Sequence, residues 1–109
     1  MEARVSKESA SDKVGKRYRI RVLEGDRDRF FDQSWTAIDV EMDGQVYRFE
    51  LEKAFWTTCP EFRDGKTGPQ LIRDWLERHN VPLTWPPSSP PKVRLEPVPA
   101  SKGRFRILP

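Results

Sequence analysis

The sequence predicts an α+β domain in which five mainly antiparallel strands form a curved sheet and one main helix lies on its apolar face. Two observations carry this expectation: a β-hairpin centred on Asp43-Gly44, and an amphipathic helix that follows Pro69. The predicted order is three strands, a helix and two strands. An OB-type barrel has this order, and so do open sheets that one helix crosses, so both architectures stay open at this point.

The hairpin is the most specific local signal. Residues 35–42 and 45–51 alternate apolar and polar side chains around Asp43-Gly44. An Asp-Gly pair favours a type I′ turn, because both central residues of that turn need a positive φ. A two-residue loop fixes the register, which gives the hairpin one apolar face and one charged face. The predicted pairs are Met42–Gln45, Glu41–Val46, Val40–Tyr47, Asp39–Arg48, Ile38–Phe49, Ala37–Glu50 and Thr36–Leu51.

Three further segments show the period of a half-buried strand. Residues 16–23, 92–97 and 104–108 alternate apolar side chains with charged ones. Lys102-Gly103 marks the turn between the last two segments. These segments complete the predicted five strands.

The main helix is predicted between Pro69 and Asn80. Proline suits the first helical position because its missing N–H would have no partner there, and Val81-Pro82 ends the helix. The predicted apolar stripe consists of Leu71, Ile72, Trp75 and Leu76.

The remaining segments are predicted to be less regular. Residues 24–34 form a charged loop, and a Thr58-x-x-Glu61 capping box indicates a short helical turn near Cys59. Residues 84–91 are too rich in proline for regular structure. Their P-x-x-P pattern fits either a rigid connector or a polyproline II ligand.

Composition and chain ends set the domain boundaries. Residues 1–15 hold too few apolar side chains to offset their ordering entropy and are predicted to be a disordered N-terminal tail, while residues 16–109 form one domain. A single cysteine excludes an internal disulfide, and no apolar run approaches the roughly 18 residues of a membrane span. We therefore expect a cytoplasmic protein without a membrane partner. With one cysteine and one histidine we expect no metal and no cofactor.

Tryptophan and arginine supply the predicted binding surface. The chain has four tryptophans and a formal net charge of +3, and these two residue types are the typical anchors of protein interfaces. We expect a non-catalytic module that binds a protein partner or a second copy of itself. The predicted surface consists of Trp35, Trp56, Trp85, Arg17, Arg19, Arg21, Arg104 and Arg106.

Single-stranded nucleic acid is the second hypothesis for the same surface. A base would stack on Trp35 while outward arginines on an OB-like sheet face pair with phosphates. Against it, Arg19 and Arg21 are expected opposite Asp39 and Glu41, where cross-strand pairing would neutralise them.

An enzyme is the third hypothesis. Cys59 and His79 are the only residues that would form a thiol–imidazole pair. A structural cysteine and a histidine at a helix end explain both residues without catalysis.

Five segments in the second half of the chain form a recognisable pattern: Ala54-Phe55-Trp56, Cys59-Pro60-Glu61, residues 72–76, residues 90–97 and residues 104–107. With these segments, residues 54–108 resemble short uncharacterised bacterial proteins, some of which are carried on mobile gene cassettes. The resemblance implies a self-standing bacterial domain and brings no activity or site with it.

Overall fold

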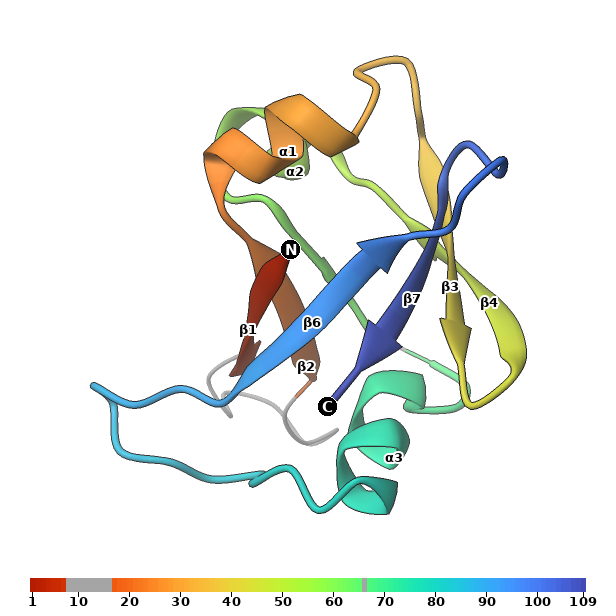
Figure 1. Ribbon diagram of the computed structural model, residues 1–109. Coiled ribbons are helices and arrows are strands. Elements are labelled where there is room, and N and C mark those ends of the chain that lie inside the picture. Colours follow the sequence, from red (N-terminus) through yellow and green to blue (C-terminus); the bar gives the residue numbers. More distant parts are fainter. Residues whose placement is uncertain (8–16, 66) are drawn as a thin grey trace.

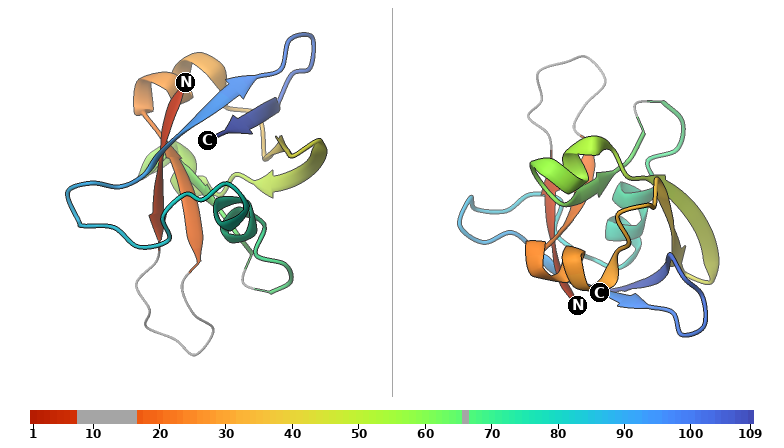
Figure 2. Two further views of the ribbon diagram at one scale, coloured as in Figure 1. Left: turned by 60° about the horizontal axis from the view of Figure 1, so that its bottom comes forward. Right: turned by 90° about the horizontal axis from the view of Figure 1, so that it is seen from above.

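The computed structural model describes residues 1–7, 17–65 and 67–109. One seven-stranded sheet coils into a nearly closed barrel, in the order β4-β3-β7-β6-β1-β2-β5 (Figures 1 and 2). The pair β3–β7 is parallel and the other neighbouring strands are antiparallel. The strands are β1 (Glu2–Lys7), β2 (Tyr18–Val22), β3 (Ala37–Met42), β4 (Gln45–Glu50), β5 (Glu61–Arg63), β6 (Lys92–Pro97) and β7 (Arg104–Leu108), and the helices are α1 (Glu24–Phe30), α2 (Lys53–Thr57) and α3 (Leu71–Arg78).

The α+β class and the mainly antiparallel, curved sheet are confirmed, and so is the hairpin. Strands β3 and β4 pair in the predicted register from Met42–Gln45 to Ala37–Glu50. Asp43 and Gly44 have φ angles of 54° and 82°, as a type I′ turn requires. The register was predictable because the loop length and the two-residue period are both local properties.

The predicted number of five strands is wrong, and part of the error lies in the N-terminal tail. Residues 2–7 of that tail form β1, which pairs with β2 on one side and β6 on the other. Ala3 and Val5 point inward and are 1% and 0% exposed. Two inward side chains suffice here because both edges of the strand are hydrogen-bonded, a contribution that composition does not reveal. Residues 8–15, the rest of the predicted tail, lie outside the described residues.

The second unexpected strand is β5, where a short helical turn was predicted. Its single inward residue is Phe62, whose ring lies 5.1 Å from that of Phe49 on β4. Backbone bonds beyond its two ends attach the segment to β2, from Val22 N–H to Pro60 at 3.0 Å and from Asp64 N–H to Tyr18 at 3.3 Å. Three residues cannot show a strand period, so β5 depends on its partner.

The helices lie at the two ends of the barrel. Helices α1 and α2 are at one end, and α3 is at the other (Figure 1). Helix α1 occupies the segment predicted as a charged loop, and α3 begins at Leu71 rather than at Pro69. Because the sheet coils instead of staying open, α3 packs at the end of the barrel rather than across a flat sheet face.

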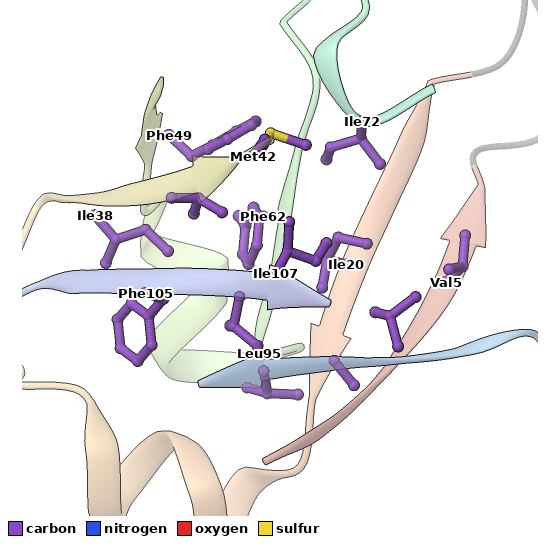
Figure 3. Packing of buried hydrophobic residues seen from close by; sticks show 14 of the residues in the cluster. Val5, Ile20, Ile38, Met42, Phe49, Phe62, Ile72, Leu95, Phe105 and Ile107 are labelled. Atoms are coloured by element: carbon purple, nitrogen blue, oxygen red, sulfur yellow. The ribbon is translucent and has the colours of Figure 1, made fainter. Parts of the chain in front are cut away.

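The inward side chains of all seven strands meet inside the barrel, as Figure 3 shows for Val5, Ile20, Ile38, Leu95 and Ile107. Ile72, Trp75 and Leu76 of α3 join them, each with no exposed surface. The predicted apolar stripe of the helix is therefore confirmed for these three residues, and Leu71 is partly buried.

A buried carboxylate begins α3. Asp64 is 1% exposed and accepts hydrogen bonds from the backbone N–H groups of Ile72 at 2.8 Å and Arg73 at 3.3 Å. It thus acts as an N-terminal cap, although it lies seven residues before the helix. Burial raises the pKa of Asp64, and the two backbone hydrogen bonds oppose that rise.

Candidate interaction surfaces

The three tryptophans of the predicted surface are all half-buried and pack against the core. Trp56 contacts the ring of Phe55 at a centroid distance of 5.0 Å. Trp85 lies in the proline-rich loop, and the centroid of its ring is 6.4 Å from that of Tyr18. The Lys7 ammonium lies 4.6 Å from the centroid of the Trp85 ring. Both side chains therefore contribute to the fold, at opposite ends of the barrel.

Trp35 is the tryptophan that combines core contact with a groove. Its ring packs edge-to-face on two core rings, 6.2 Å from Phe31 and 6.5 Å from Phe105. Trp35 also lines a groove of about 430 Å³, which we call the Trp35 groove. The groove is lined by Phe30, Trp35, Pro97, Val98, Ala100, Ser101, Lys102, Gly103, Arg104 and Phe105.

The arginines of the predicted surface are distributed over several places. Arg104 lines the Trp35 groove. Arg17 lines a cavity of about 350 Å³ at the seam where the edge strands β4 and β5 face each other, together with Arg48 and Arg63. Tertiary structure thus brings Trp35 and Arg104 together and separates both from Arg17.

The expected cross-strand partners of Arg19 and Arg21 are wrong. Strand β2 pairs with β1 and β5 rather than with β3, so Arg19 binds Glu61 on β5 at 3.0 Å and donates to the Lys7 carbonyl. Asp39 and Glu41 face β7 instead, and Glu41 binds Arg106 at 3.0 Å. Local pattern could not show which strands become neighbours in the sheet.

Sequence reasoning missed one basic residue because it lies in the predicted tail. Arg4 is an outward residue of β1, directly opposite Arg21 on β2 and Lys92 on β6. The signal was present in the alternation of Glu2, Ala3, Arg4 and Val5, but it is too short to identify a strand by itself.

A turn interrupts the proline-rich loop within its P-x-x-P segment. The Ser89 N–H donates to the Pro86 carbonyl at 2.9 Å, which closes a turn around Pro87 and Ser88. A polyproline II helix has no such internal hydrogen bond. This turn therefore does not fit the polyproline II ligand interpretation of residues 87–90.

Cys59 and His79 do not form a pair. Cys59 follows α2 and His79 follows α3, and these helices lie at opposite ends of the barrel (Figure 1). Burial raises the pKa of the Cys59 thiol, and the nearby Glu61 adds to that rise, so the nucleophilic thiolate is disfavoured.

His79 instead takes part in an ionic cluster at the hairpin turn. Asp43 accepts a hydrogen bond from Arg78 Nε at 2.9 Å, and its other oxygen lies 2.7 Å from His79 Nε2. Both contacts lower the pKa of Asp43, and the hydrogen bond from Arg78 has the larger effect. The cluster ties the β3–β4 turn to the end of α3.

The Asp43→Asn variant is expected to be less stable than the wild type at neutral pH and to approach it in acid. Asparagine tolerates the positive φ of this turn but lacks the charge. Because the folded pKa of Asp43 is lowered, the stability that it contributes is present at neutral pH and is lost as the pH falls through that pKa. Thermal unfolding at neutral and acidic pH measures the difference. The control is Arg48→Gln on the same hairpin, whose difference in stability from the wild type is expected to stay constant with pH. The same constant difference for Asp43→Asn would contradict the ionic role of Asp43.

Within residues 1–7, 17–65 and 67–109, no cluster of three or more His, Cys, Asp or Glu side chains has the arrangement of a metal site. None of the described helices has the length and apolar character needed to cross a bilayer. No family model matches the chain, and no match was found among curated proteins or solved structures.

Proposed function

We propose that this protein is a non-catalytic interaction module that binds an extended segment of a partner protein in the Trp35 groove. One observation carries the proposal: the aromatic side chains of Phe30 and Trp35 and the cationic side chains of Lys102 and Arg104 line the same groove. Aromatic rings beside cations are the usual composition of the residues that dominate binding energy in protein interfaces.

The shape of the groove is supported from within the fold. Phe31 and Phe105 hold the indole of Trp35 in place, and the loop after β6 packs near it, since a Cβ on Gly103 would lie 3.9 Å from the indole. Ala100 has a φ of 65°, an uncommon conformation for a residue other than glycine. A groove formed in advance lowers the entropy that binding costs.

The chemistry of the groove favours a particular kind of segment. Its apolar floor fits a proline or aromatic side chain, and Lys102 and Arg104 would pair with an acidic residue beside that side chain. We also propose that the barrel is related to the OB fold, although it has seven strands where that fold has five. In OB barrels the loops between strands bind ligands, and here the loop between β6 and β7 lines the Trp35 groove.

Peptide selection tests the proposal. A displayed library of random peptides is selected on the whole protein, and the affinity of selected peptides is measured by fluorescence anisotropy. We expect enrichment of aromatic or proline residues next to acidic ones, and affinity about ten-fold weaker for Lys102→Gln/Arg104→Gln, equivalent to about 1.4 kcal/mol. The matched control Arg48→Gln/Arg73→Gln removes the same charge from exposed positions elsewhere and is expected to bind normally.

Two results would count against this function. Selected peptides that bind the Lys102→Gln/Arg104→Gln variant as well as the wild type would place their site elsewhere. Saturable binding of a thymidine oligonucleotide that is lost in this variant and competes with the peptides would favour the nucleic-acid hypothesis instead.

A further inference from the structure

A second surface lies on the outer face of β6, β1 and β2, where three basic residues stand in one row. Arg4 at the centre is directly opposite Arg21 on β2 and Lys92 on β6. Their neighbours along β1, Ala3 and Val5, are buried in the core, so the three basic side chains point to the solvent side of the sheet.

The two arginines of this row lack internal partners. Among the described residues, the side chains of Arg4 and Arg21 form no hydrogen bond and no ion pair, while the Lys92 side chain reaches Glu2 at 3.5 Å. Like charges directly opposite each other in a sheet are unfavourable. An anionic group placed between Arg4 and Arg21 would remove that repulsion, so the row is complementary to a carboxylate.

An apolar groove adjoins the row. Leu23 follows β2 and is 56% exposed, the highest value among the large hydrophobic residues of the described chain. It lines a groove of about 470 Å³ together with both arginines and with Pro60 and Pro90. Glu2 and Glu24 also line the groove, and Glu2 is already paired with Lys92. We call this surface the Arg4–Leu23 groove.

We propose that the Arg4–Leu23 groove binds an acidic segment of a partner protein, with a carboxylate between Arg4 and Arg21 and an aliphatic side chain against Leu23. The site is distinct from the Trp35 groove and does not depend on it. A protein segment fits better than a nucleic acid, because the residues that line this groove include no aromatic ring on which a base would stack.

The test uses a fluorescein-labelled peptide of three Glu-Leu-Asp-Glu repeats, titrated with the full chain and followed by anisotropy. We expect saturable binding that weakens when the salt is raised from about 50 to about 300 mM, because the arginines are solvent-exposed. Arg4→Gln/Arg21→Gln is expected to weaken binding about ten-fold or more. Leu23→Ser, or a peptide with serine in place of leucine, is expected to weaken it about three-fold to ten-fold through the lost apolar contact.

The controls separate this site from net charge and from the Trp35 groove. Lys102→Gln/Arg104→Gln removes the same charge and is expected to change affinity for the acidic peptide less than about two-fold. Arg4→Gln/Arg21→Gln is expected to unfold at the wild-type temperature or above, since it removes repulsion, and to keep its affinity for peptides selected on the Trp35 groove. Each groove is thus tested by its own peptide and its own double variant, so a negative result for one groove does not decide the other.

Three outcomes would overturn the inference. The first is no saturable binding of the peptide at low salt. The second is equal weakening by the two double variants, which would reduce the effect to overall charge. The third is tighter binding of a thymidine oligonucleotide of similar length that is lost in Arg4→Gln/Arg21→Gln, which would make the surface a nucleic-acid site.

Discussion

Replacing Trp75 by alanine is expected to lower the free energy of unfolding by about 3–5 kcal/mol. Trp75 is the largest fully buried side chain among the described residues, and it extends from α3 into the interior of the barrel. Alanine would leave a large cavity at the end of the barrel that α3 covers. Urea unfolding followed by circular dichroism measures the change.

Phenylalanine at the same position is expected to recover more than half of that loss. The indole Nε1 of Trp75 is buried and has no hydrogen-bond partner among the described residues. An unsatisfied buried donor costs about 1–3 kcal/mol, so removing it offsets part of the lost packing. If Trp75→Phe proves as destabilising as Trp75→Ala, the indole N–H is satisfied and this explanation is wrong.

Asp64→Ala is expected to lower the free energy of unfolding by about 2–3 kcal/mol. The substitution removes the acceptor for the N–H groups of Ile72 and Arg73, at the beginning of the helix that carries Trp75. Asp64→Asn keeps one acceptor oxygen and is expected to cost less. Urea unfolding at neutral pH compares the two variants, with Asp74→Ala in the exposed first turn of α3 as the control. Equal stability of Asp64→Ala and the control would refute the capping role.

Asp64 also gives the protein a defined pH dependence. Burial is the main reason that the pKa of Asp64 in the folded protein is raised above its ordinary value of 3.8. At a pH between the unfolded pKa and this raised folded pKa, the folded state therefore binds more protons than the unfolded state. The contribution of Asp64 to stability therefore decreases as the pH rises through this interval. Asp64→Asn removes this decrease, so the variant loses less stability than the wild type over the same pH interval. The contribution of Asp43 to stability instead increases as the pH rises, because the pKa of Asp43 is lowered. The effect of Asp64→Asn is therefore measured in proteins that both carry Asp43→Asn.

Local signals in the sequence were sufficient for the β3–β4 hairpin and for the buried face of α3. Asp43-Gly44 admits one common turn, and the alternation on both sides then leaves one register. In α3, the spacing of Ile72, Trp75 and Leu76 places them on one face whatever they pack against. These features depend on residues within a few positions of each other.

The candidate surfaces depended on contacts between distant segments. Arg104 was predicted as part of the surface, but only the β3–β7 pairing and the loop before β7 place it in the same groove as Trp35. Arg4 was assigned to a disordered tail, and it became central to a binding surface because β2 and β6 enclose β1. No local pattern specifies such neighbours.

By itself, the sequence determined the α+β class, the hairpin register and the inward face of each predicted strand, because turn chemistry and hydrophobic period act over a few residues. Only the tertiary structure decided that the sheet has seven strands and nearly closes, that Asp64 caps α3, and which charges are paired. Strand β5 is stabilised by β2, a partner far away in the chain, and Asp64 reaches the start of α3 across a loop that has no regular pattern of its own. The free energy of these contacts exists only once the barrel has formed.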